Sequence, residues 1–207
     1  AAAEELVTSG GVVGILGGDC AGVTGAIRSN VAVPNGIAMI SPSATSPALS
    51  TAEDNGLFFR TSPSDAREGE IAADIMTDRG IKTAALTYSN SDYGKGLAEA
   101  IQKGFEAKGG KITISAAHED GKADYAAEVA SLAAAGGDIL IVAGYVDQGG
   151  SGILRAAVDT GAFSLFELPG GMISDTLTTN VPEGLNGSFG QVPGNDSPGL
   201  KTLGEMS

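Results

Sequence analysis

Short apolar runs alternate along this chain with segments whose apolar residues recur at helical spacing. The short runs are typical of buried strands, and the periodic segments are typical of amphipathic helices. Because a helix between two strands returns the chain to the same end of a sheet, this alternation favours an α/β fold with a largely parallel sheet. We therefore predict a three-layer, doubly wound parallel sheet. Strands are expected at residues 11–16, 37–40, 58–61, 83–88, 111–116, 138–143, 164–168 and 187–192. Helices are expected at residues 4–9, 23–33, 65–79, 94–108, 125–135 and 148–160.

Composition excludes several classes of protein. The 207 residues carry 12 Lys plus Arg against 25 Asp plus Glu, a net charge of −13, so nothing neutralises the phosphates of a nucleic acid. No apolar run approaches the roughly 18–20 residues that span a bilayer. The first residues lack a basic start and an apolar centre, so we expect that any export signal was removed or not included. Cys20 stands alone and cannot form an internal disulfide.

The residue inventory also argues against several kinds of catalysis. With one His and one Cys, the chain has no His/Cys set at metal-ligand spacing. It contains neither the G-x-G-x-x-G signature of dinucleotide-binding sites nor the G-x-x-x-x-G-K-[ST] signature of sites for nucleoside triphosphates. His118 lies in a polar stretch after a predicted strand, where a surface position is more common than a catalytic one. We predict no metal, no cofactor and no enzymatic activity.

Polar or aromatic residues follow five of the predicted strands directly. In a doubly wound sheet these positions line the crevice at the carboxyl ends of the strands, where ligands bind. The five stretches read GGDCAG, SPSATS, SNSDYG, GYVDQ and ELPGG. Tyr93 and Tyr145 each stand at or just before a helix in such a loop. Each tyrosine alone can equally well be a half-buried side chain that packs against its own domain. The five loops together favour a ligand site.

The stretch SPSATS at residues 41–46 combines several hydroxyls with Pro42, and Pro47 follows it. One interpretation is a capped turn, since Ser, Thr and Pro are ordinary loop formers. The other is a preorganised cradle of hydroxyl and N–H groups for a small anion, placed at the carboxyl end of a strand.

Four stretches together resemble the branched-chain amino-acid binding proteins of bacterial ABC transporters, the leucine/isoleucine/valine-type periplasmic binding proteins. They are ISPSATSPALS, FFRTSPSD, LTYSNSDYGKGLAEAIQKGFEAKGGKI and DILIVAGY. Each stretch alone is weak, but their order and spacing cover nearly the whole chain. The resemblance implies a type I periplasmic binding fold, in which two α/β lobes joined by crossing strands close on a small ligand.

The same resemblance implies the organisation of the chain. Residues 1–57 form part of the first lobe, and 58–61 are a crossing strand. Residues 62–186 form a nearly complete second lobe, and 187–207 are a second crossing strand with the start of the return to the first lobe. Members of the family have an additional first strand and helix and a long return, so we expect a fragment whose unfinished sheet edge can pair in a dimer.

By resemblance, the ligand carboxylate is held by the SPSATS stretch, through Ser43, Ala44 and above all the N–H and hydroxyl of Thr45. Tyr93 and Tyr145 match the tyrosines that close over the ligand. The usual serine of the first loop falls near Ala21, which leaves only a backbone contact there.

One departure from the family concerns the ligand's amino group. Amino-acid-binding members place an acidic residue where Gly170 stands, and a buried ammonium without such a partner is costly. Glu167 or Asp175 can substitute after a local shift; equally, the ligand can be an aromatic or other organic acid.

The sequence thus predicts a periplasmic solute-binding protein that delivers a small carboxylate, first of all a branched-chain amino acid, to a membrane permease. Two alternatives remain: a ligand-sensing receptor domain on the same fold, and an enzyme on an α/β scaffold.

Overall fold

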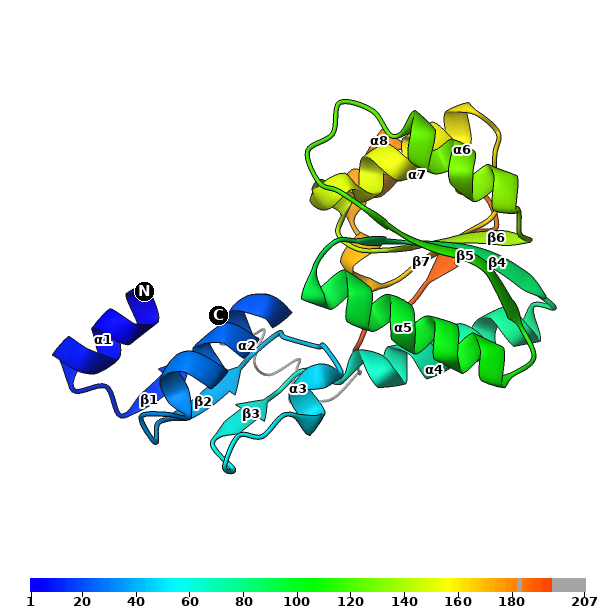
Figure 1. Ribbon diagram of the computed structural model, residues 1–207. Coiled ribbons are helices and arrows are strands. Elements are labelled where there is room, and N and C mark those ends of the chain that lie inside the picture. The colour runs from blue at the N-terminus through cyan, green and yellow to red at the C-terminus, as the bar shows by residue number, and fades with distance from the viewer. Residues whose placement is uncertain (182–183, 195–207) are drawn as a thin grey trace, which may run out of the picture.

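A computed structural model describes residues 1–181 and 184–194, and its strands form two parallel sheets. The first sheet has the order β1-β2-β3 and the second the order β5-β4-β6-β7-β8. Figure 1 shows the two sheets side by side, each with its own helices. The first sheet comprises β1 (Gly14–Leu16), β2 (Ala38–Ser41) and β3 (Phe58–Arg60). The second comprises β4 (Thr83–Ser89), β5 (Lys111–His118), β6 (Ile139–Ala143), β7 (Phe166–Leu168) and β8 (Phe189–Gly190).

Helices cover both faces of the second sheet. On one face, α4 (Asp65–Asp78) and α5 (Asp92–Ala107) share a buried apolar core with β4 and β6. On the other face lie α6 (Ala126–Ala135), α7 (Ser151–Asp159) and α8 (Asp175–Asn180), which pack with β6 and β7 (Figure 1). Every strand pair in this sheet is parallel. The predicted doubly wound, three-layer α/β fold is confirmed for this part of the chain.

The helices begin where the sequence places capping residues. Ser64 accepts a hydrogen bond from the Ala66 N–H at the start of α4, and Ser91 accepts one from the Gly94 N–H in α5. Such caps satisfy N–H groups that have no partner within the helix. Beyond the end of α4, Gly80 adopts a φ of 74°, which favours glycine. The predicted helix 148–160 is less regular, because a distorted turn, η2 (Val146–Gly150), precedes α7.

The first sheet carries α1 (Ala2–Gly10), α2 (Ala21–Ile27), the π-helical turn η1 (Arg28–Ala32) and α3 (Ala48–Thr51). Its small core contains Ala32, Met39, Ala44, Leu49 and Phe58. The prediction of a buried strand at 11–16 is wrong: the strand comprises only Gly14–Leu16, and none of residues 11–16 is buried. Leu16 at its end is 82% exposed, because no described element covers that face of the sheet.

The uncovered face of the first sheet is apolar. Leu16 pairs with Ile40 and Ile40 with Phe59 in the strand register, and all three side chains are exposed. Apolar patches of this kind, next to open strand edges, favour association with another chain.

We predict that the 207-residue chain self-associates through this face. Sedimentation velocity at increasing concentration should show a dimer, and the double substitution Ile40→Thr with Phe59→Thr should shift it toward monomer because it removes apolar contact area. Leu6→Thr, which changes an exposed apolar residue on α1, serves as the control. A wild-type chain that stays monomeric at all concentrations would contradict this.

Three short helical elements were not predicted: α3, η3 (Gly170–Met172) and α8. The predicted strand 187–192 corresponds to β8, while the expected return at 195–207 lies outside the described residues. Among the described helices, none has the length and apolar character to cross a membrane.

Candidate functional site

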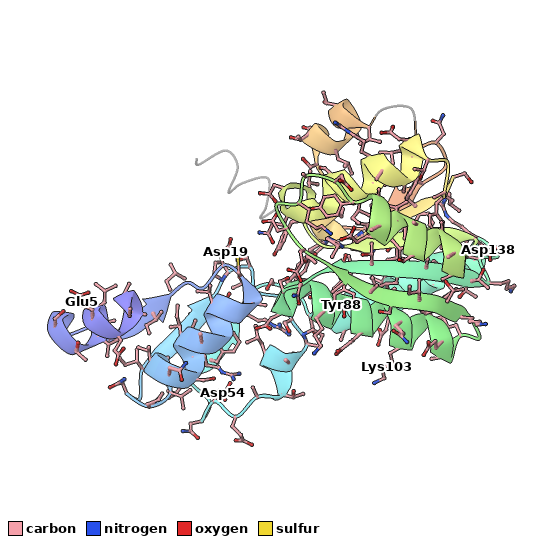
Figure 2. All side chains as sticks on the ribbon, turned by 45° about the horizontal axis from the view of Figure 1, so that its top comes forward. Glu5, Asp19, Asp54, Tyr88, Lys103 and Asp138 are labelled. Carbon is pink, nitrogen blue, oxygen red and sulfur yellow. The ribbon has the colours of Figure 1, made fainter. Side chains whose placement is uncertain are left out.

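The five loops singled out in the sequence lie at the carboxyl ends of strands, and all five meet through contacts described below. In Figure 2, Asp19 marks the loop after β1, and Tyr88 marks the carboxyl end of β4. Asp138, just before β6, lies at the far end of the second sheet. The carboxyl end of the second sheet therefore faces the first sheet, as expected for a ligand crevice.

Thr45 connects the loop after β2 to the start of α4. Its hydroxyl donates to Asp65 Oδ2 at 3.0 Å, and its carbonyl accepts from the Asp65 N–H at 2.9 Å. Asp65 is 1% exposed, and burial raises the pKa of its carboxyl to about 7, although the Thr45 hydroxyl opposes this rise. The predicted ligand-binding hydroxyl is thus already bonded to a buried acidic group that the sequence did not single out as a site residue.

Ser43 and Ala44 have different surroundings. Ser43 is exposed, and its hydroxyl donates to the carboxylate and to the carbonyl of Asp19. Ala44 is 1% exposed; its N–H donates to Ser41 Oγ at 3.1 Å, and its carbonyl accepts from the Ser62 hydroxyl at 3.0 Å. The backbone of Ala44 therefore holds the loop in place, while Ser43 and Thr45 face the neighbouring loops.

Tyr93 and Tyr145 come together as predicted for a pair of aromatic side chains at the crevice. Their ring centroids are 4.6 Å apart with an interplanar angle of 31°. Burial, followed by the charges of Glu68 and Asp65, raises the pKa of Tyr93 above its usual value. Burial also raises the pKa of Tyr145 to about 12, with smaller effects from Cys20 and Asp19. Both hydroxyls are therefore neutral and can donate hydrogen bonds at neutral pH.

Gly171 fixes the position of this tyrosine pair. Its N–H donates to the Tyr93 hydroxyl at 3.2 Å. A Cβ at this position would lie 2.3 Å from the Gly144 carbonyl oxygen and 3.1 Å from the Tyr145 ring. Only glycine fits without movement of the loop after β6.

We expect Gly171→Ala to destabilise the protein by about 1–3 kcal/mol, the usual cost of overpacking a well-packed site. Gly170→Ala is the matched control, because its Cβ would meet nothing closer than 3.6 Å and should change stability by less than about 0.5 kcal/mol. Chemical denaturation of both variants tests this. Equal stability of the two variants would show that the loop adjusts freely.

Gly170 lies beside an acidic side chain that sequence reasoning missed. Its N–H donates to Glu68 Oε1 at 2.9 Å, and the Gln191 side chain donates to the same oxygen at 3.3 Å. Burial raises the pKa of Glu68. Asp65 and Glu68 are three residues apart in α4, so helical spacing after the Ser64 cap could have indicated that they share a face.

The two acids proposed to replace the missing one have different surroundings. Asp175 is exposed at the start of α8. Glu167 is completely buried, and within the described residues neither of its carboxyl oxygens makes a hydrogen bond. Burial raises its pKa to about 8; the nearby Gln191 side chain opposes this, and the Glu68 charge adds to it.

Ala21 is the first residue of α2, is 5% exposed and packs into the core of the second sheet. The neighbouring Gly22 lies close to Asp92, whose Oδ2 would be 3.0 Å from a Cβ at that position. The start of α2 therefore contacts the start of α5, with Cys20 exposed next to it.

Cavities in the described residues flank this cluster of loops. One of about 100 Å³ lies between the start of α4 and the segment after β8, and Thr45, Asp65, Glu68 and Gln191 line it. A larger one, of about 780 Å³, runs between α2, α3 and α5; of the predicted site residues only Ala21 lines it. We place the candidate site at the first, because only there do acidic groups meet the Thr45 hydroxyl.

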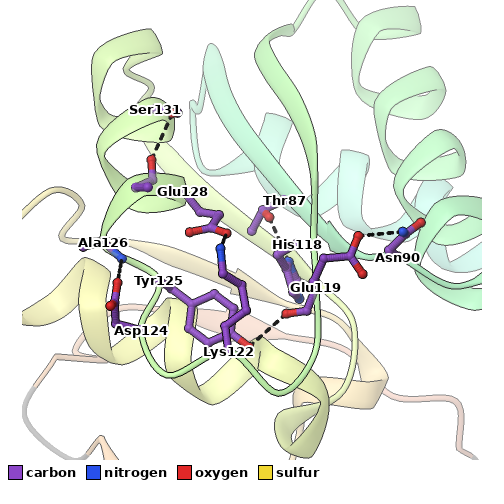
Figure 3. A network of polar contacts seen from close by, with 11 residues as sticks. Thr87, Asn90, His118, Glu119, Lys122, Asp124, Tyr125, Ala126, Glu128 and Ser131 are labelled. Carbon is purple, nitrogen blue, oxygen red and sulfur yellow. Dashed lines mark hydrogen bonds and ion pairs between the residues drawn. The ribbon is translucent and has the colours of Figure 1, made fainter.

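His118 is not a surface residue, contrary to the prediction. It is the last residue of β5, is 1% exposed, and its Nδ1 lies 2.9 Å from the Thr87 hydroxyl (Figure 3). Its ring packs edge-on against Tyr125, whose hydroxyl donates to the Glu119 carbonyl. Burial lowers its pKa. The strand continues two residues further than predicted, which carries the side chain into the core. Within the described residues, no group of three or more His, Cys, Asp or Glu could hold a metal.

Comparisons with known proteins identify the family of this chain. Residues 1–201 match the periplasmic binding protein family model, and the chain belongs to that family. Among curated proteins it is 28% identical, over 93% of its length, to the leucine-, isoleucine-, valine-, threonine- and alanine-binding protein of Pseudomonas aeruginosa. It is 29% identical, over 94% of its length, to the Leu/Ile/Val-binding protein of Escherichia coli K12. It covers 51% and 54% of these proteins, so the chain spans about half the length of the curated relatives it matches.

Solved structures show the same fold. The alignment with a leucine-binding protein from Thermotoga maritima covers 99% of this chain and 59% of the Thermotoga chain. Its TM-score is 0.87 at 20% sequence identity. The alignment with a solute-binding protein from R. palustris in complex with 4-hydroxybenzoate covers 87% of this chain and 49% of the R. palustris chain. Its TM-score is 0.76 at 20% sequence identity. The resemblance read from the sequence, and the type I periplasmic binding fold that it implied, are confirmed.

Proposed function

We propose that the protein is an extracytoplasmic, non-enzymatic solute-binding protein that captures a small carboxylate, an amino acid of the branched-chain class, for the permease of an ABC transporter. The observation that carries this proposal is the contact of Thr45 with Asp65 beside the Tyr93–Tyr145 pair. A hydroxyl donor, buried carboxyls and an aromatic pair suit the carboxylate, the ammonium and the apolar body of such a ligand.

The proposal assigns residues 1–57 to a first lobe and 62–186 to a second, joined by crossing segments at 58–61 and 187–192. The ligand binds between them, with Thr45 from the first lobe and Tyr93 and Tyr145 from the second. Ser43, Ala21 and Gly170 border the site. The Leu/Ile/Val-binding relatives support the ligand class, and the match to the periplasmic binding protein family supports the periplasmic location.

A second candidate is an aromatic or other organic acid without an amino group. The observation that favours it is Gly170, which offers no carboxylate where an ammonium partner is expected. The solute-binding protein from R. palustris, whose structure contains 4-hydroxybenzoate, has the same fold.

A thermal-shift screen of the full-length protein separates the candidates, because a ligand that binds the native state raises its apparent stability by mass action. The screen compares leucine, isoleucine and valine with their 2-oxo acids and with benzoate and 4-hydroxybenzoate. Stabilisation by the amino acids supports the first candidate. Stabilisation only by acids lacking an amino group supports the second, and turnover of any of these compounds would contradict a binding protein.

A further inference from the structure

The carboxylate of Glu68 lies in the space that a side chain at position 170 would enter. A Cβ built on Gly170 would stand 3.6 Å from Glu68 Oε1, an ordinary van der Waals distance. Gly170 itself carries no negative charge, but Glu68 of α4 places a carboxylate close to where an acidic side chain at position 170 would lie.

Two hydrogen bonds from different segments hold this carboxylate. The Gly170 N–H, in the loop after β7, donates to Oε1 at 2.9 Å, and Gln191 Nε2, in the segment after β8, donates to the same atom at 3.3 Å. Both bonds use Oε1, and Glu68 keeps partial exposure to solvent. Its second oxygen remains available for a further donor.

The acidic groups around Glu68 form no ion pair within the described residues, although the charge of Arg60 acts to lower the pKa of Asp65. Asp65 and Glu167 lie near enough for the Glu68 charge to raise the pKa of each. Glu167 is completely buried without a hydrogen bond within the described residues, although the Gln191 side chain lies near it. Such a cluster is costly unless a positive charge joins it.

We propose that Glu68 is the residue that recognises the ligand's ammonium group, in place of an acid at position 170. The assignment rests on the proposed function, since it requires an amino-acid ligand. An ammonium donating to Glu68 forms a charge-assisted hydrogen bond in a partly desolvated site. The charge of Glu68 acts on the buried Tyr93 hydroxyl, so the carboxylate lies beside the tyrosine pair. Glu68 thus distinguishes amino acids from acids of the same shape without an amino group.

Calorimetric titration of the full-length protein with L-leucine and with 4-methyl-2-oxopentanoate tests this role. Glu68→Gln keeps an oxygen for the Gly170 N–H but removes the charge. We expect it to weaken leucine binding at least about 100-fold, as for loss of one partner of a buried ion pair. Binding of the 2-oxo acid should change less than about threefold. Glu70→Gln, on the same helix but 61% exposed at its side chain, is the matched control and should leave both affinities unchanged.

A second variant keeps the test independent of folding defects. The double substitution Glu68→Ala with Gly170→Glu empties the space of the Glu68 carboxyl and returns a carboxylate from position 170, where a Cβ would meet nothing closer than 3.6 Å. It should regain at least about tenfold of the lost leucine affinity.

Leucine affinity that survives Glu68→Gln, or an equal loss for both ligands, would overturn the assignment of Glu68 alone. A wild-type protein that binds the 2-oxo acid or 4-hydroxybenzoate but no amino acid would overturn the amino-acid part of the proposed function, and the assignment with it.

Discussion

Raising the pH from about 5 to 9 should lower the free energy of unfolding of the wild-type protein far more than that of a Glu167→Gln variant. Glu167 is completely buried, and its pKa is raised to about 8 because burial disfavours the charged carboxylate. In the unfolded chain a glutamate titrates near 4.3. The folded protein therefore binds more protons than the unfolded chain between these two values.

The sign of the effect follows from this difference in proton binding. Stability from a group with a raised pKa is fully present below the unfolded value and is lost as the pH rises through the folded value. One proton corresponds to about 1.4 kcal/mol per pH unit, so wild type should lose roughly 3–5 kcal/mol more than Glu167→Gln across the window. Asp65, with a pKa of about 7, contributes in the same direction in both proteins.

Urea denaturation of both proteins at several pH values measures this difference. The comparison concerns the slope with pH, so a change in absolute stability caused by the amide does not affect it. Glu106→Gln, an exposed position on α5, should keep the wild-type slope. Parallel profiles for wild type and Glu167→Gln would show that Glu167 ionises normally in the folded protein.

The second sheet could be predicted closely because its signals are local. The central strands β4 and β6 are short, largely apolar runs. The helices of this part of the chain up to α7 show apolar periodicity, with side-chain serine caps at α4 and α5. The main errors arose where tertiary packing decides the outcome. Nothing in the polar run after Ala117 indicates that β5 continues to His118, or that Thr87 and Tyr125 would bury its ring.

The site was predictable in part for the same reason. Residues that follow strands can be listed from sequence, and Tyr93 and Tyr145 do meet. The acidic groups were missed because Glu68 reaches Gly170 across 102 positions of sequence, a contact that only the crossover of the sheet creates. Ser64 caps α4, which leaves the Asp65 carboxylate free to accept a hydrogen bond from Thr45.

Thr45→Ala should weaken carboxylate binding by at least about tenfold in the full-length protein. The hydroxyl lost is a donor to a charged acceptor, and such hydrogen bonds contribute roughly 1.5–3 kcal/mol. In the structure this hydroxyl donates to Asp65 Oδ2. It must turn toward the ligand on binding, since it has a single proton, and Asp65 then needs another donor. A ligand ammonium can supply that donor, whereas a 2-oxo acid cannot.

Titration calorimetry with L-leucine and 4-methyl-2-oxopentanoate therefore distinguishes a direct contact of Thr45 with the ligand from an indirect role through Asp65. Thr45→Ser keeps the hydroxyl and should restore most of the affinity. Thr61→Ala removes a nearby exposed hydroxyl that donates only to the Pro42 carbonyl and should have no effect. If Thr45 contacts the ligand carboxylate, both ligands weaken in Thr45→Ala, because both carry that group. If Thr45 acts only by holding Asp65, leucine alone weakens, because only leucine uses the Asp65 charge. Unchanged affinity for both ligands would remove Thr45 from the binding site.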